Sequence, residues 1–238
     1  MEWFFIYAIK TDILEQNSLY SYSILKFVFM NYLEALSRRY SVKKFNPELI
    51  IPQETLLNIL EAGKLSASSM GLQPYKILIV ESKEMKEKLI PAFYNPSQIS
   101  TCSHLIVIST KKTIDENYIH GYFSHISEVR DVPLENLNLF KKSINQYITQ
   151  KSQDEIFNWA EKQSYIVLAN LIYAAAMENI DTCPMEGFRQ NLIEEILDID
   201  TEQEKITVTL ALGFRSNEDE FQHMKKVRKP NEKLFKFI

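Results

Sequence analysis

Glycine is scarce in this chain, and its placement excludes several common architectures. The 238 residues include only five glycines, at positions 63, 71, 121, 187 and 213. No two of them are spaced to form the G-x-G-x-x-G turn of dinucleotide-binding βαβ folds, the G-x-x-x-x-G-K-[ST] phosphate loop or the G-x-S-x-G nucleophile elbow. The sequence therefore predicts that any bound nucleotide is held by side chains, or by backbone that is not rich in glycine.

The overall composition is that of an ordinary globular protein. Hydrophobic residues make up 45% and charged residues 24%, with a net charge of −4. These values exclude the disordered and fibrous classes and give no charge field that favours nucleic acid. The length suits one large domain or two small ones.

Two cysteines, Cys102 and Cys183, form no disulfide framework, which favours a reducing, cytoplasmic compartment. The four histidines lack metal-ligand spacing, so we expect no metal site.

Residues 1–29 differ from the rest of the chain. They hold eight aromatic residues and neither glycine nor proline. The apolar run at 3–9 has no preceding basic residue and no following A-x-A site, unlike a signal peptide, and it is too short for a transmembrane helix. We expect an extension outside the functional domain, such as a mis-assigned start. A membrane-surface or partner-binding helix is the alternative. The functional domain is predicted to span residues 30–238.

Helices and strands mix irregularly after residue 30, which predicts an α+β fold with helices on both sides of one sheet. Helices are expected at 31–37, 52–64, 85–93, 153–178 and 191–197, strands at 75–80, 104–109, 180–184 and 206–214, an extended segment at 39–45, and a polar, helical excursion at 111–150. The stretch from Tyr165 to Met177 is apolar on nearly every side of a helix. It is therefore predicted to be buried in a large core or between subunits.

Two short basic segments have a pattern that suits a phosphate dianion. An extended backbone places Arg39, Ser41 and Lys43 on one face of the segment RRYSVKKF at 38–45. Lys226 and Arg228 share a face in the same way in KKVRKP at 225–230. Guanidinium and ammonium groups with a hydroxyl bind phosphate well, although a solvated basic surface has the same pattern. The second segment is short and lacks interleaved aromatic residues, so nucleic acid is not expected as a partner.

Three other segments can present polar groups to a ligand. The small residues of SASSMGLQP at 66–74 let backbone donors approach closely. NPSQ at 95–98 carries two amides three residues apart, and PMEG at 184–187 forms a turn after a predicted strand. Taken singly, these three segments are explained more simply by an ordinary connection, a helix cap and a simple turn.

The five segments together resemble, in order and spacing, the motifs of the nitroreductase family, in its oxygen-insensitive NAD(P)H nitroreductase and dihydropteridine reductase-like branch. The resemblance runs from about residue 30 to the C-terminus. It implies a three-layer α/β/α fold with a mainly antiparallel sheet flanked by helices. It also implies an intertwined homodimer that binds FMN at the subunit interface.

The resemblance assigns parts of the cofactor to particular residues. The phosphate end falls to both basic segments, the polar edge of the ring to Lys43 and Asn95, and the flavin N5 region to a backbone N–H of the 184–187 turn. Residues 67–69 would come from the partner subunit, and no side chain is implied as an acid or base. The implied cofactor-binding residues are Arg39, Tyr40, Ser41, Lys43, Ala67, Ser68, Ser69, Asn95, Gln98, Pro184, Met185, Glu186, Gly187, Lys226 and Arg228.

The chain departs from the family pattern at three positions. Ala67 replaces the proline of the partner loop, Gly71 replaces an asparagine common there, and Gln98 replaces a lysine found in some relatives. These changes concern the preference for NADH or NADPH, and the range of acceptors, more than flavin binding.

The function that the resemblance implies is a ping-pong oxidoreductase. NAD(P)H would reduce FMN and leave, and a nitroaromatic, a quinone or a similar electron-poor acceptor would then bind at the same face. Another flavin chemistry on the same fold, such as reductive dehalogenation or flavin fragmentation, is one alternative. A flavin-binding dimer without significant turnover is the other. A membrane partner is not expected.

Overall fold

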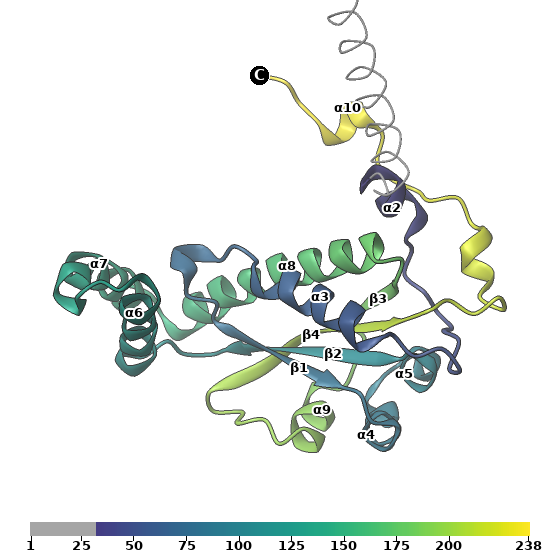
Figure 1. Ribbon diagram of the computed structural model, residues 1–238, viewed down its shortest axis with the longest axis horizontal. Helices are drawn as coiled ribbons and strands as arrows, with labels where there is room; N and C mark the ends of the chain where they lie inside the picture. The colour runs from purple at the N-terminus through teal and green to yellow at the C-terminus, as the bar shows by residue number, and fades with distance from the viewer. Residues whose placement is uncertain (1–31) are drawn as a thin grey trace, which may run out of the picture. The chain divides into compact units, whose positions relative to one another are not determined.

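The computed structural model describes residues 32–238 (Figure 1). The predicted extension at 1–29 lies outside the described residues. The chain separates into two units, residues 1–38 and residues 39–238. The described part of the first unit is helix α2 (Tyr32–Arg38). The second unit holds the sheet and the other helices.

A four-stranded antiparallel sheet forms the centre of the second unit. Its order is β1 (Tyr75–Val80), β2 (His104–Lys111), β4 (Glu204–Gly213) and β3 (Asp181–Met185). The two inner strands are buried along almost their whole length, because helices cover both faces of the sheet. The predicted α+β class is therefore confirmed.

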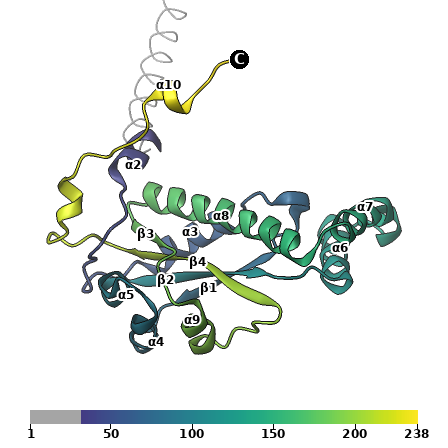
Figure 2. The same cartoon turned by 180° about the vertical axis from the view of Figure 1, so that it is seen from behind.

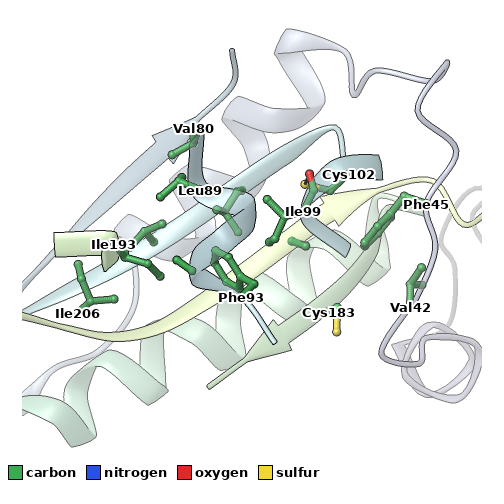
Figure 3. Close-up of a cluster of buried hydrophobic side chains, with 14 residues drawn as sticks. Val42, Phe45, Val80, Leu89, Phe93, Ile99, Cys102, Cys183, Ile193 and Ile206 are labelled. Carbon is green, nitrogen blue, oxygen red and sulfur yellow. Dashed lines mark hydrogen bonds between the residues drawn. The ribbon is translucent and has the colours of Figure 1, made fainter. Parts of the chain in front are cut away.

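Helices form a layer on each face of the sheet, which confirms the three-layer arrangement (Figures 1 and 2). α3 (Gln53–Lys64) and α8 (Gln153–Met177) cover one face. α4 (Lys83–Leu89), α5 (Pro96–Thr101) and α9 (Gln190–Ile196) cover the other. Successive side chains of a strand point to opposite faces. On β2, Leu105 and Val107 accordingly join the apolar cluster of Figure 3, while Ile106 and Ile108 pack beneath α3 and α8.

The long helix α8 is not buried on all sides within one chain. It begins at a capping box, in which the Ser152 hydroxyl accepts from the Glu155 backbone and the Glu155 carboxylate accepts from the Ser152 backbone. Tyr165, Ile166 and Tyr173 remain 38%, 41% and 40% exposed along one stripe of the helix. One chain alone therefore does not bury this stripe, and the predicted burial would require a surface from another molecule.

The excursion at 111–150 is helical, as predicted. It consists of α6 (Glu116–Arg130), the 3₁₀ turn η3 (Leu134–Leu137) and α7 (Asn138–Thr149), which share a small apolar core around Phe123. Shorter elements are η1 (Ser69–Gly71), η2 (Ile90–Ala92), η4 (Glu220–His223) and α10 (Asn231–Leu234). Within residues 32–238, no helix is both long and apolar enough to cross a membrane.

Candidate functional site

The segment 39–45 pairs with the edge strand β3 at Ser41, but the chain bends at Lys43 and Lys44. The predicted extended backbone, and with it the predicted shared face of Arg39, Ser41 and Lys43, therefore does not continue through Lys43. The Val42 N–H donates to the Thr182 carbonyl at 3.1 Å. Tyr40 and Val42 pack against the apolar cluster of Figure 3. Successive side chains of an extended chain point to opposite faces, so Arg39 is expected on the face opposite to Tyr40. The segment thus has one face anchored in the core and one face available for polar contacts.

An ion pair fixes the end of β4 to the start of β3, beside this segment. Arg215 Nε lies 3.1 and 3.0 Å from the two carboxylate oxygens of Asp181, and Arg215 Nη2 lies 2.5 Å from Oδ1. These hydrogen bonds raise the pKa of Arg215. The Asp181 side chain is 7% exposed, and the Arg215 guanidinium lies 4.7 Å from the centre of the Tyr40 ring. The pair therefore supports the side chain next to Arg39.

The two predicted basic segments meet in space, although 187 residues separate them in the chain. Lys226 Nζ donates to the Arg39 carbonyl at 2.5 Å. Burial and the positive charge of Arg228 lower the pKa of Arg39, and burial together with both arginines lowers the pKa of Lys226. Like charges held this close repel one another, so the cluster favours an anion that carries more than one charge.

Lys43 and Gln98 meet at the thiol of Cys183, which Figure 3 places between β3 and the 39–45 segment. Lys43 Nζ lies 4.0 Å from Cys183 Sγ. Gln98 Nε2 donates to Cys183 Sγ at 2.8 Å and contacts the Val42 carbonyl at 3.4 Å. Burial raises the pKa of the Cys183 thiol, and Lys43 acts against that shift. Gln98 is 4% exposed, so its amide nitrogen serves the protein interior, whereas Lys43 stays half-buried.

Asn95 lies beside the 184–187 segment. Pro184 and Met185 are the last two residues of β3 rather than part of the predicted turn, so only Glu186 and Gly187 follow the strand. The Tyr94 N–H donates to the Gly187 carbonyl at 3.1 Å. Asn95 occupies the N-cap position of α5, yet its side chain makes no capping hydrogen bond there. Capping therefore does not explain this amide. The carboxylate of Glu186 accepts a hydrogen bond from the Tyr165 hydroxyl at 2.6 Å, which ties the turn to α8.

The loop at 66–74 is ordered by side chains of α6 and α8. The hydroxyl of Tyr122 donates to the Met70 carbonyl at 2.9 Å, and that of Tyr118 donates to the Leu72 carbonyl at 2.7 Å. The Ser69 N–H donates to Gln163 Oε1 at 2.8 Å. Ala67 is exposed, and Ser68 and Ser69 are half-buried.

Within one chain, this loop is far from the 39–45 segment. It leads into β1, where Tyr75 pairs with Thr110, while the 39–45 segment lies at the end of the sheet where His104 pairs with Leu212. His104 and Thr110 are about 20 Å apart along β2 at the usual rise of a strand. Figures 1 and 2 show α6 at one end of the sheet and α5 at the other. Residues 67–69 are thus the part of the predicted set that one chain does not bring to the site.

The departure at Gly71 has a physical reason. Gly71 has φ +72°, and a Cβ atom on it would overlap the Tyr122 hydroxyl. We expect Gly71→Ala to lower the free energy of unfolding by about 1–2 kcal/mol from the left-handed backbone alone, with the overlap adding to this cost. Thermal unfolding measures the effect. Gly121→Ala is the matched control, because a Cβ on Gly121 meets no atom within 4 Å.

A second variant separates the two contributions to this cost. In a Tyr122→Phe background the overlapping hydroxyl is absent, so the cost of Gly71→Ala should fall to the backbone part. An equal cost in both backgrounds would show that Tyr122 is not the obstacle.

Sequence reasoning missed Asp181, Arg215 and Asp219, which hold the site together. Asp219 is 2% exposed, yet it stands in the run NEDE at 217–220, which is typical of a solvated loop. Asp181 and Arg215 are 34 residues apart and carry no local pattern that links them. For Asp181 and Arg215 a more useful signal was their position at the ends of two predicted strands; Asp219 had no such signal.

Comparison with known proteins supports this reading of the fold. A family model described as the Nitroreductase family matches residues 36–214. A Staphylococcus haemolyticus protein named for NAD(P)H nitroreductase activity is 32% identical over 214 residues, which cover 87% of this chain and 96% of the relative. A Bacillus subtilis protein named for the same activity is 34% identical over 196 residues, which cover 77% and 88%.

Solved structures share the fold. A Staphylococcus epidermidis protein named for NAD(P)H:FMN oxidoreductase activity superimposes with a TM-score of 0.78 at 25% identity, over 89% of this chain and 98% of that chain. An Exiguobacterium sibiricum protein solved in complex with FMN superimposes with a TM-score of 0.77 at 21% identity, over 88% and 98%.

Proposed function

Because the chain belongs to the nitroreductase family, we propose that it is an FMN-dependent NAD(P)H oxidoreductase. Its acceptors would be nitroaromatics, quinones or similar electron-poor compounds, reduced by a ping-pong mechanism. The observation that carries the proposal is the cluster formed by Arg39, Lys226 and Arg228, where two distant basic segments converge. The structural neighbour in complex with FMN supports the choice of cofactor.

The cation cluster fits the phosphate end of FMN. A phosphate monoester carries close to two negative charges, which would relieve the mutual repulsion of Arg39, Lys226 and Arg228. A guanidinium can bind two phosphate oxygens at once. Ser41 lies beside this cluster on a half-buried stretch of the 39–45 segment, and its hydroxyl would add a further donor.

The ring of the cofactor would lie next to Lys43, Asn95 and the 184–187 segment. When bound, FMN supplies the redox chemistry, since it accepts a hydride from NADH or NADPH and passes electrons to the acceptor. Lys43 would place a positive charge at the polar edge of the ring, where negative charge develops on reduction. Asn95 would donate at the same edge, and the backbone of Glu186 and Gly187, held by Tyr165 and Tyr94, would orient the ring. Gln98, turned inward, would hold the Cys183 thiol and the Val42 carbonyl rather than contact the cofactor.

We infer that two chains complete each site. Ser68 and Ser69 lie at the end of the sheet opposite to Arg39, so only the loop of another copy could bring them to the same phosphate. The exposed apolar stripe Tyr165, Ile166 and Tyr173 on α8 supports a homodimer. Apolar side chains that are exposed in a row on a long helix favour association.

Complementation between two defective chains tests this arrangement. One chain carries Arg39→Ala, which removes a phosphate ligand. The other chain carries Ser69→Asp, which places a negative charge in its 66–74 loop. Each variant alone should bind FMN poorly. Co-expressed and purified as a mixed dimer, the pair should regain one intact site, because the unaltered Arg39 and the unaltered loop then meet across the interface. A mixed dimer that binds no more FMN than the parents would contradict a shared site.

The absorption spectrum of the purified protein tests the function itself. We expect a yellow protein with one FMN per chain, whose visible absorbance bleaches under NADH or NADPH without oxygen and returns on addition of a quinone. A chain that begins at residue 30 should behave identically, since the proposed flavin-binding domain spans 30–238. A colourless protein that takes up no added FMN would refute the proposal. Bleaching without recovery by any acceptor would leave a flavin-binding protein without turnover.

A further inference from the structure

Asp219 is a buried acidic residue close to the cluster of Arg39, Lys226 and Arg228. It is 2% exposed and is the last buried residue of the chain, because the residues from 220 to 238 are all exposed or half-buried. Lys226 and Arg228 belong to that exposed final stretch. A carboxylate near a phosphate site weakens anion binding by charge repulsion alone. Its presence therefore needs another explanation.

The hydrogen bonds of Asp219 provide that explanation. Oδ2 accepts from the backbone N–H of Lys43 at 2.7 Å and of Lys44 at 3.2 Å, and Oδ1 accepts from the N–H of Phe221 at 3.1 Å. One carboxylate thus joins the 39–45 segment to the final stretch of the chain. Burial alone would raise the pKa of Asp219, but the three backbone N–H groups, together with the Tyr40 hydroxyl, outweigh it and hold the pKa below its usual value. The group therefore stays ionised, as three N–H donors require.

The residues around Asp219 show what it fixes. Before it, the Ser216 N–H donates to the Lys44 carbonyl at 3.0 Å. After it, Lys43 Nζ lies 5.8 Å from the centre of the Phe221 ring. Lys226 then reaches the Arg39 carbonyl. The exposed stretch therefore returns to the 39–45 segment after Asp219 has anchored it.

We propose that Asp219 is a positioning residue for phosphate recognition, which holds Lys226 and Arg228 against Arg39 so that the three cations act on one phosphate group. This inference rests on the proposed function. In this role the negatively charged Asp219 strengthens the binding of an anion. A purely electrostatic role would weaken that binding, so the direction in which Asp219 variants change the FMN affinity separates the two roles.

The test compares FMN with riboflavin, which lacks the phosphate, on the full-length protein freed of flavin. In Asp219→Ala and Asp219→Asn, the dissociation constant for FMN should rise about ten-fold or more, as expected for the loss of charged contacts. The dissociation constant for riboflavin should rise clearly less than that for FMN. Riboflavin has no phosphate to lose, so only the support that Asp219 gives to the Lys43 backbone affects its binding. Flavin fluorescence measures both constants.

Glu218→Gln is the matched control. Glu218 pairs with Lys44 at the surface, and its side chain is 73% exposed. The control removes the same charge one residue away, without touching the buried hydrogen bonds. We expect its FMN dissociation constant to stay within about two-fold of the wild-type value.

Three outcomes would overturn the inference. Asp219 variants that bind FMN as tightly as the wild type, or more tightly, would show that the residue acts only through its charge. An equal loss of affinity for FMN and riboflavin would show a general structural role. Additive effects of Asp219→Asn and Lys226→Ala on FMN binding would show that Asp219 does not place Lys226. This double-mutant cycle uses the near-isosteric Asp219→Asn variant, so it does not require the Asp219→Ala variant to fold.

The failure of this inference differs from that of the proposed function. A wild-type protein that binds neither flavin contradicts the proposed function. A wild-type protein that prefers FMN, with the same preference in the Asp219 variants, contradicts only the role given to Asp219.

Discussion

Replacing Arg39 with alanine is expected to raise the dissociation constant for FMN by about ten- to hundred-fold, since a hydrogen bond to a charged group contributes roughly 1.5–3 kcal/mol. Arg39 is the expected phosphate ligand because of its position. It is next to Tyr40, which is anchored in the core, and Lys226 contacts its backbone carbonyl. Arg39→Lys should restore only part of the affinity, because an ammonium keeps the charge but loses the planar fork. Titration of the flavin-free variants with FMN measures the effect.

Arg38→Ala is the matched control for this prediction. Arg38 is the last residue of α2, in the other unit of the chain. We expect its removal to leave FMN affinity nearly unchanged. If Arg38→Ala weakens binding and Arg39→Ala does not, the register assigned to the whole 39–45 segment is wrong by one residue. At saturating FMN, Arg39→Ala should regain much of its turnover, because the phosphate end is remote from the redox-active ring.

Asp181→Ala should have the largest effect on stability. It would leave the partly buried guanidinium of Arg215 without the two oxygens of its one carboxylate partner, and removal of one partner of a buried ion pair costs about 3–5 kcal/mol. For a chain of this size the thermal midpoint should fall by roughly 10 °C. The contact between Arg215 and Tyr40 should loosen as well, which would weaken FMN binding.

Two comparisons check the reason for this loss. The double variant Asp181→Ala, Arg215→Met should be more stable than Asp181→Ala alone, because no unpaired charge then remains buried. Glu218→Ala removes a surface ion pair with Lys44 and should cost less than about 1 kcal/mol. A single variant as stable as the wild type would show that the pair contributes nothing to the fold.

The strands were predictable because continuous apolar runs mark strands that are covered on both faces. The run at 75–80 matches β1 at both ends, and the run at 104–109 extends by two residues to Lys111. Helix boundaries were less certain. The helix expected at 85–93 begins at Lys83, where Ser82 caps it, and becomes a 3₁₀ turn from Ile90, since Pro91 cannot supply a helical N–H.

The site was predictable only in part. The basic segments carry their own pattern, so Arg39, Lys226 and Arg228 could be named before the fold showed that they meet. Asp219 could not, because a buried carboxylate and a solvated one look alike in a sequence. The inward orientation of Gln98 depends on Cys183, which lies 85 residues away. Such long-range pairing leaves no local trace in the sequence.

The placement of the 66–74 loop and the cation cluster at opposite ends of the sheet has a consequence for mass action. On the proposed arrangement, a chain that dissociates from its partner loses part of each phosphate contact. Linkage then requires FMN to tighten self-association by the same factor by which self-association tightens FMN binding. Cofactor occupancy would consequently depend on protein concentration, and extreme dilution would release flavin from a protein whose sequence is unaltered.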